Sequence, residues 1–213
     1  MAQKENSLQQ LILALASITM VATAALSCIY IATKEPIEKI KIEKDNAAKT
    51  MVLPGFDPNT GYFSTVKVLT ESLKDSLTVS LAYMNNQLFG AAVSTHTNIA
   101  FSGRFDIMVG FNPEGNILNT EVLGHQETPG LGDKIDKKKD KFPLQFVGKS
   151  PKDYALKVKK DGGEIDAITA ATISSRAFCD AVNNAYNAFQ IALQNAELNT
   201  SSNINEEKEE NHE

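Results

Sequence analysis

Hydrophobic and polar positions follow different periods along the chain, and the first pattern is an unbroken apolar run. Residues 6–33 contain no charged side chain and consist mainly of Leu, Ile, Val and Ala. Roughly 20 mostly apolar residues in a helix cross a bilayer core. We therefore predict a transmembrane helix over 8–33, preceded by a short N-terminal end at 1–7. The charged stretch 34–75 is interpreted as a stalk and connecting segment, in which 63–76 fits a strand or a short helix equally.

Residues 76–198 are predicted to form the folded domain, and hydrophobic positions in its first part alternate with a period of two. Two apolar runs flank the turn "NNQ" at 85–87, and Phe105, Ile107, Val109 and Phe111 share one face of a strand that turns at "NPEG" and returns over 116–125. Such runs around tight turns predict antiparallel hairpins. The runs "PLQFVG", "YALKVK" and "EIDAI" predict further short strands at 143–148, 154–159 and 164–168.

The clearest helical period begins after residue 171. Its apolar stripe consists of Phe178, Val182, Ala185, Phe189 and Leu193. Such a stripe buries one helix face, and we expect that face to pack on the sheet. The fold class is therefore α+β, an antiparallel sheet with packed helices. Beyond 198 the chain is polar and acidic, which predicts a disordered tail over 199–213.

Composition and charge exclude some partners. The formal charge is −5, but the last eight residues hold five glutamates and one lysine and so contribute −4 of it. The rest of the chain is nearly neutral, which gives no electrostatic case for a nucleic-acid partner. The lysine-rich run "KIDKKKDK" at 134–141 is interpreted as a solvated loop. Two cysteines make neither a disulfide framework nor a metal site.

The N-terminal run leaves two questions open. A lipoprotein signal ending in "ALSC" would place a lipid on Cys28, although the apolar "IYIA" that follows fits this alternative poorly, and a cleaved signal would have a shorter apolar region. Lysines are more frequent after the run than before it. The positive-inside bias alone would keep the C-terminal domain in the cytoplasm, but this bias is weak for long translocated domains. Charge therefore leaves the orientation open.

Two stretches have a composition that suits ligand binding, and the first is "GHQETPGLGDKI" at 124–135. Gly130 and Gly132 can adopt positive φ and let a ligand approach the backbone. The spacing matches neither a phosphate loop nor a dinucleotide fingerprint, and a tight Pro-Gly turn is the structural alternative. His125 and Glu127 together could suggest acid–base chemistry or a metal site, but further ligands are missing.

The second stretch is "DAITAATISSRAF" at 166–178, with four hydroxyl side chains in ten residues: Thr169, Thr172, Ser174 and Ser175. Hydroxyls before a helix cap its free amides, and a helix start also binds phosphate. Arg176 could add positive charge there. A hydrolase nucleophile is disfavoured because no Gly-x-Ser-x-Gly elbow is present.

Together these stretches resemble the FMN-binding subunits of the Rnf electron-transport complex and of the sodium-translocating NADH:quinone reductase. "HQETPGLG" at 125–132 matches that family's His-x-Glu-Thr-Pro-Gly-Leu-Gly signature, and "DAITAAT" at 166–172 matches its Asp-x-x-Ser/Thr-Gly-Ala-Thr flavinylation motif. "FSGRFDIMVGFNPEGNI" at 101–117 is also similar. The resemblance covers about 75–195 and the N-terminal helix, and the chain's length and "GLGDKI" are more similar to the Rnf member, its G subunit, than to the longer quinone-reductase member.

The resemblance implies that a flavin transferase joins the phosphate of FMN to the Thr172 hydroxyl as a covalent ester. It implies no catalytic or metal-ligating residue, and it gives Asp166 a role in motif recognition or in a local turn. Where the family has glycine this chain has Ala170, which would be strained at positive φ. The remaining cofactor contacts implied by the two motifs are Glu127, Thr128, Gly130, Leu131, Gly132, Thr169, Ala171 and Ser174.

For function, the resemblance implies an electron-transfer subunit of an ion-translocating ferredoxin:NAD oxidoreductase and not an enzyme on its own. Its partners would be the other membrane subunits, the flavin transferase and the membrane itself. It would cross the inner (cytoplasmic) membrane once, with the FMN domain on the extracytoplasmic (periplasmic) side. The first alternative is another flavin carrier, either a component like the quinone-reductase member or a stand-alone extracytoplasmic protein. The second alternative is a non-redox membrane-anchored binding domain.

Overall fold

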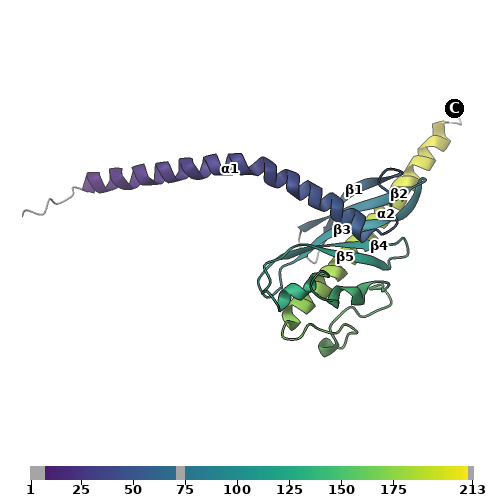
Figure 1. Ribbon diagram of the computed structural model, residues 1–213. Helices are drawn as coiled ribbons and strands as arrows, with labels where there is room; N and C mark the ends of the chain where they lie inside the picture. The colour runs from purple at the N-terminus through teal and green to yellow at the C-terminus, as the bar shows by residue number, and fades with distance from the viewer. Residues whose placement is uncertain (1–7, 71–74, 211–213) are drawn as a thin grey trace, which may run out of the picture. The chain divides into compact units, whose positions relative to one another are not determined.

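The computed structural model describes the backbone of residues 8–70 and 75–210, and side chains as far as residue 196 (Figure 1). Its contacts divide the chain into a unit up to Asp45 and a unit that begins at Asn46. The elements, in chain order, are α1 (Leu8–Val52), β1 (Gly61–Thr70), β2 (Asp75–Met84), β3 (Gln87–Thr97), β4 (Phe105–Phe111), β5 (Ile117–Gly124), the 3₁₀ turns η1 (Gly132–Ile135), η2 (Phe142–Phe146) and η3 (Lys159–Asp161), and α2 (Thr172–Glu210).

The apolar run forms the first part of α1, and its side chains are exposed throughout. Within the described part of the chain, α1 is the one helix long and apolar enough to cross a membrane. This confirms the predicted N-terminal apolar helix. The helix is longer than predicted, because the charged residues after 33 continue it to Val52.

The five strands form one antiparallel sheet in the order β1-β2-β3-β4-β5, so every strand pairs with its neighbours in the sequence. The β2–β3 hairpin turns at Asn85 and Asn86, whose φ angles are 52° and 62°. Two-residue hairpin turns of this kind need positive φ at both positions, and asparagine tolerates it better than most residues. The predicted antiparallel sheet is confirmed, and the ambiguous segment 63–76 contributes most of β1 and the start of β2.

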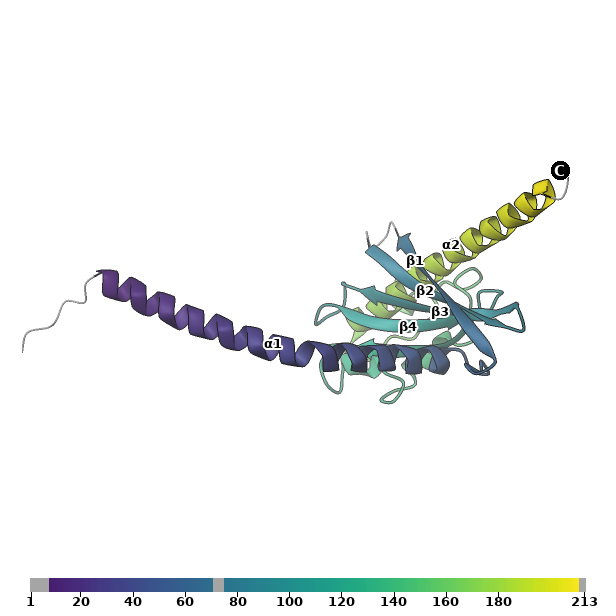
Figure 2. The ribbon, with the colours of Figure 1, turned by 90° about the horizontal axis from the view of Figure 1, so that it is seen from above.

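One face of the sheet packs on the first half of α2 (Figure 2). Phe178, Val182, Ala185 and Phe189 are completely buried, and the ring of Phe189 stacks on Phe111 of β4 at 5.1 Å. The apolar stripe of the helix thus meets the apolar face predicted for β4. This confirms that α2 covers the sheet.

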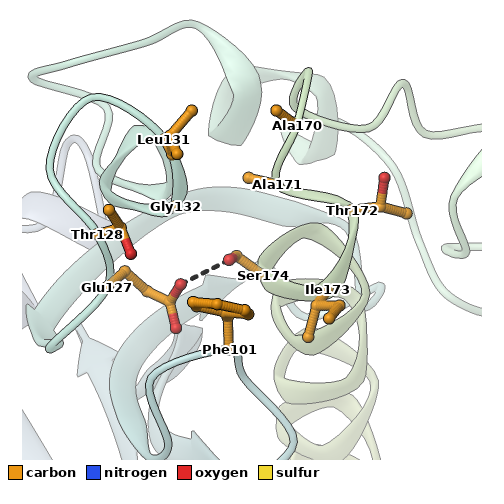
Figure 3. Close-up of a pocket in the computed structure, with 10 residues that line it drawn as sticks. All are labelled: Phe101, Glu127, Thr128, Leu131, Gly132, Ala170, Ala171, Thr172, Ile173 and Ser174. Atoms are coloured by element: carbon orange, nitrogen blue, oxygen red, sulfur yellow. Dashed lines mark hydrogen bonds between the residues drawn. The ribbon is translucent and has the colours of Figure 1, made fainter.

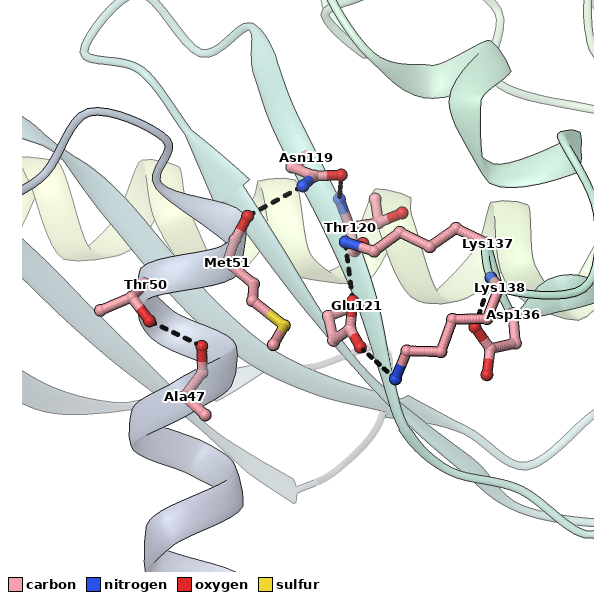
Figure 4. Close-up of polar contacts among 9 residues, drawn as sticks. All are labelled: Ala47, Thr50, Met51, Asn119, Thr120, Glu121, Asp136, Lys137 and Lys138. Atoms are coloured by element: carbon pink, nitrogen blue, oxygen red, sulfur yellow. Dashed lines mark hydrogen bonds and ion pairs between the residues drawn. The ribbon is translucent and has the colours of Figure 1, made fainter.

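The opposite face packs on the last turn of α1 and the turn that follows, where Val52 and Leu53 are fully buried beside Met108 of β4. The Asn119 side chain of β5 donates a hydrogen bond of 2.8 Å to the carbonyl oxygen of Met51 (Figure 4). That carbonyl belongs to the last turn of a helix, where backbone oxygens lack helical partners. Gly110 of β4 makes the contact possible, because a Cβ there would overlap the backbone of Val52.

Several boundaries differ from those predicted. The compact unit begins at Asn46 and includes β1, whereas the sequence pattern predicts a domain from 76. The segment 143–148 lies mostly in η2 and the two runs over 154–168 contribute only one bridge, between Val158 and Ile165. Phe146, Leu156, Val158, Ile165 and Ile168 are buried in the α2-facing core from largely unpaired backbone, whereas Leu144, Val147 and Tyr154 are exposed. Periodicity alone does not separate such buried irregular segments from strands.

The C-terminal segment also differs from the prediction. The tail expected to be disordered from 199 is helical as far as Glu210. No glycine or proline occurs between 172 and 210, so nothing in the backbone chemistry ends the helix there.

Substituting Gly110→Ala tests the packing of the last turn of α1 on the sheet. The added methyl group would overlap the Val52 backbone, and overpacking of this kind costs about 1–3 kcal/mol. We expect urea unfolding of the full chain in detergent to show that loss. Gly124→Ala is the matched control, because no atom lies within 4 Å of its added Cβ; equal midpoints for the two variants would contradict the packing argument.

Candidate functional site

Three segments that are distant in the sequence enclose a cavity of about 300 Å³ (Figure 3). The turn between β3 and β4 contributes one residue, the loop after β5 contributes four, and the start of α2 with the residues before it contributes five. The lining residues are Phe101, Glu127, Thr128, Leu131, Gly132, Ala170, Ala171, Thr172, Ile173 and Ser174. Both the glycine-rich and the hydroxyl-rich stretches of the sequence therefore meet at one site.

The carboxylate of Glu127 connects all three segments. One oxygen accepts a 2.6 Å hydrogen bond from the Ser174 hydroxyl in α2, and the other accepts a 3.0 Å bond from the backbone N–H of Ser102. Glu127 is only 5% exposed, and a buried carboxylate without partners would be costly. These two bonds therefore hold the walls of the cavity together.

Two glycines of the loop are needed for different reasons. A Cβ on Gly132 would overlap the Glu127 carboxylate and crowd the Ser174 hydroxyl, so only glycine leaves room for that hydrogen bond. Gly130 has open space around it but a φ of +76°, a conformation that favours glycine. Gly132 lines the cavity, whereas Gly130 shapes the turn without lining it.

The four hydroxyls of the second stretch have separate roles. Ser174 bonds to Glu127, while Ser175 accepts from the N–H of Ile168 and donates to the carbonyl of Ala171. Thr169 is exposed and lies at another depression, which it shares with Asp166. Among these four, Thr172 alone combines a position in the cavity wall with a hydroxyl that makes no hydrogen bond within the described residues.

The start of α2 leaves backbone donors free. The N–H groups of Thr172, Ile173 and Ser174 have no acceptor within the described part of the chain, and no hydroxyl of the stretch caps them. The capping interpretation is therefore wrong for these amides. Free amides at a helix start and the helix dipole together favour an anion such as a phosphate.

The predicted contribution of Arg176 to this anion site is wrong. Its guanidinium forms two 2.7 Å bonds with the carboxylate of Asp161, outside the cavity. The paired guanidinium holds the pKa of Asp161 below its ordinary value, and the carboxylate raises the pKa of Arg176. Nearby, burial raises the pKa of the Cys179 thiol to about 12, so this thiol is neutral at pH 7 and unsuited to nucleophilic chemistry.

His125 has a local role. Its Nδ1 accepts a 3.1 Å hydrogen bond from the backbone N–H of Glu127, two residues later. The described residues contain no group of three His, Cys, Asp or Glu side chains that could hold a metal ion. His125 thus shapes the loop backbone next to Glu127.

The lysine-rich run does not simply lie in solvent. Lys139 forms a 2.6 Å ion pair with Asp133, and Lys137 forms a 2.7 Å pair with Glu121 of β5 (Figure 4). Asp133 is 3% exposed, and its hydrogen bond with Lys139 is the main reason that its pKa is lowered. These pairs attach the run to β5 and to the residue that follows Gly132. Sequence distance alone does not reveal such pairing.

Three cavity residues were not predicted as contacts from the sequence: Phe101, Ala170 and Ile173. Phe101 and Ile173 are apolar, yet both are exposed. Phe101 is two residues before a glycine in a turn and shows no apolar period. The available sequence signals were an aromatic side chain where a turn is expected and the family resemblance of the segment 101–117, and neither singled out Phe101 as a contact.

Ala170 has a φ of +61°, in the left-handed region. This residue also lines the cavity, directly before Ala171 and Thr172. The left-handed conformation costs a non-glycine residue roughly 1–2 kcal/mol. The strain anticipated from the alanine in place of glycine is therefore present.

Comparison with known proteins gives an independent view of this site. Residues 101–187 match the FMN-binding domain family, a range that starts at Phe101 and includes all three cavity segments. The G subunit of the ion-translocating oxidoreductase complex of Aliivibrio fischeri is 34% identical over 197 residues, which cover 88% of this chain and 94% of that protein. The G subunits of Vibrio atlanticus (34% over 190 residues) and Vibrio vulnificus (32% over 185) cover 86% and 84% of this chain, and 88% of each relative.

Substituting Ala170→Gly tests the strain. Glycine would remove the cost of the left-handed conformation, but its greater freedom in the unfolded chain costs about 0.5–1 kcal/mol. We therefore expect the free energy of unfolding to increase by about 0.5–1 kcal/mol. Urea unfolding of the full chain measures the difference. Ala171→Gly is the matched control, since this buried neighbour has no positive φ and should lose about 1 kcal/mol. Destabilisation by both changes would contradict the assignment of strain to Ala170.

Proposed function

Since the chain belongs to the G-subunit family of ion-translocating oxidoreductase complexes, we propose that it is a membrane-anchored electron carrier with FMN covalently attached to Thr172. The observation that carries this proposal is the free hydroxyl of Thr172 in the wall of a cavity within an FMN-binding domain. When bound, FMN supplies reversible electron transfer, and the protein supplies binding and orientation.

The cavity residues fit this cofactor in three ways. The volume of about 300 Å³ is at the lower end of the range for ligand pockets and suits a planar ring system better than a whole dinucleotide. Thr172 and the free amides at the start of α2 provide an acceptor hydroxyl and an anion site at one end of the cavity. Ala170 and Ala171 leave that hydroxyl accessible to a modifying enzyme.

The contacts proposed for the cofactor fall into two groups. Glu127, Thr128, Leu131, Gly132, Ala171 and Ser174 join Thr172 in the cavity wall. Gly130 acts through the shape of the turn. Thr169 lies at the neighbouring depression beside Asp166 and is exposed, which suits recognition by the flavin transferase better than a contact with FMN.

The proposed partners and location follow from the family. The names of the relatives describe a component of an ion-translocating complex, so we propose that this chain assembles with the other membrane subunits of such a complex. The apolar part of α1 would anchor it in the cytoplasmic membrane. The FMN domain would lie on the extracytoplasmic side, where the flavin transferase would act on it.

Intact-mass analysis of the full chain, co-expressed with a flavin transferase of this family, tests the covalent link. We expect the mass to increase by one FMN less one water, the balance for an ester between the Thr172 hydroxyl and the phosphate. The Thr172→Ala variant should lack the increment, while Thr60→Ala should keep it, because Thr60 is an exposed threonine in the turn before β1, outside both the cavity and the motif at 166–172. An unmodified wild-type mass, or an increment that survives Thr172→Ala, would overturn the proposal.

Reporter fusions after Glu213 test the orientation. A reporter that is active only in the periplasm should give activity, and one that is active only in the cytoplasm should not, because a single span would place the domain outside. The reverse result would mean that the lysines after the apolar run determine the orientation.

A further inference from the structure

We infer that Phe101 forms an aromatic face of the cavity on which the ring system of the bound cofactor stacks. The inference rests on the proposed function, because it takes the ligand to be FMN. It adds a positioning contact outside both sequence motifs, from the turn between β3 and β4.

The exposure of Phe101 is the first observation. Of the ten phenylalanines, all within the described residues, Phe101 alone is exposed, with 67% of its surface accessible. Seven others are buried in the two cores of the domain, and Phe63 and Phe89 are partly buried. No aromatic ring of the described residues pairs with Phe101. A large apolar ring left free at a cavity is typical of a contact that a ligand completes.

The turn that carries Phe101 is held in place. The N–H of Ser102, the next residue, donates to the Glu127 carboxylate, and the N–H of Gly103 donates to the carbonyl of Ala100 at 3.2 Å. The same carboxylate bonds to Ser174 in α2. The backbone position of the turn that carries Phe101 is therefore set by hydrogen bonds to the rest of the cavity and does not depend on packing of the ring.

Apolar groups lie on two sides of the cavity, and we call the space between them the slot. In Figure 3 the Phe101 ring lies on one side, and Leu131, Gly132 and Ala171 lie on the other. The second wall is made of small and aliphatic groups that leave room for a flat ligand. Aromatic rings stack at centroid separations of about 4.5–7 Å, and a planar heteroaromatic ring is the FMN group that fits between such walls.

The position of Thr172 beside the slot fits the attachment of FMN proposed above. In Figure 3 Thr172 lies on the α2 side of the slot, and the backbone N–H groups without an acceptor belong to the same helix start. A cofactor joined through its phosphate to Thr172 would thus place its ring toward Phe101 and Leu131. The family match that begins at Phe101 includes this turn in the FMN-binding domain.

Flavin emission from the full chain, loaded covalently by co-expression with the transferase, tests this inference. Covalent attachment keeps occupancy constant, so spectroscopic changes report the environment of the ring. In Phe101→Ala we expect lower fluorescence anisotropy and stronger quenching by iodide, since one wall is lost. In Phe101→Trp we expect emission to fall severalfold, because a stacked indole donates an electron to excited flavin. Phe101→Tyr should retain the anisotropy of the wild type.

Ile99→Ala is the matched control, because Ile99 is in the same turn and 59% exposed but does not line the cavity. Its anisotropy and iodide quenching should equal those of the wild type. Wild-type values in Phe101→Ala and unquenched emission in Phe101→Trp would overturn the inference. We would expect those unchanged values in the isolated chain if Phe101 only contacted a partner protein.

Failure of the proposed function gives a different result. If intact mass shows no attached FMN, the same variants are titrated with free FMN. Stacking on an aromatic side chain contributes about 1–3 kcal/mol, so the Kd of Phe101→Ala should rise about 5- to 150-fold, while the Kd of Ile99→Ala should be unchanged. Equal affinities, or no FMN binding by the wild type, would overturn the inference in that case.

Discussion

The site depends on one buried hydrogen-bonded group, the carboxylate of Glu127. It joins the turn after β3, the loop after β5 and the start of α2 through two bonds, to the N–H of Ser102 and to the hydroxyl of Ser174. The sheet brings the first two segments together, because β3, β4 and β5 are consecutive antiparallel neighbours and the C-terminal ends of β3 and β5 therefore lie at the same end of the sheet. The start of α2 lies at the same end because the apolar stripe of the helix packs across the sheet. Gly132 then allows the carboxylate and the hydroxyl to meet.

The apolar patterns were sufficient to predict most of the architecture. Alternation indicated the hairpins of β2 to β5, because burial of one strand face requires an apolar side chain at every second residue. The helical stripe indicated the buried face of α2, because burial of one helix face requires an apolar side chain at every third or fourth residue. The same reasoning failed for 143–148 and 154–168, where apolar side chains are buried from irregular backbone. It also did not indicate that the compact unit begins at Asn46, because the charged stretch after the apolar run shows no wide apolar face although Ala48 and Val52 are buried.

The chemistry of the site was predictable only in part. Local residue types could not decide whether the four hydroxyls cap a helix or face a ligand, because both uses need the same side chains at the same positions. The structure separates them through distant partners: Ser174 meets Glu127, 47 residues earlier in the chain, while Arg176 meets Asp161. Phe101 and the ion pairs of Lys137 and Lys139 depend on tertiary contacts for which no periodic signal exists.

The free hydroxyl of Thr172 has a consequence for the order of biosynthesis. Ser174 and Ser175 are committed to internal bonds only after the domain has folded, whereas Thr172 stays available in the finished fold. Asp166 and Thr169, in the same stretch, are also exposed. Folding thus leaves some hydroxyl side chains of this stretch hydrogen-bonded inside the domain and others accessible. If FMN is attached to Thr172 as proposed, and only after the domain has folded, the fold would present one unbonded hydroxyl of this stretch at the cavity and would contribute to the selectivity of the attachment.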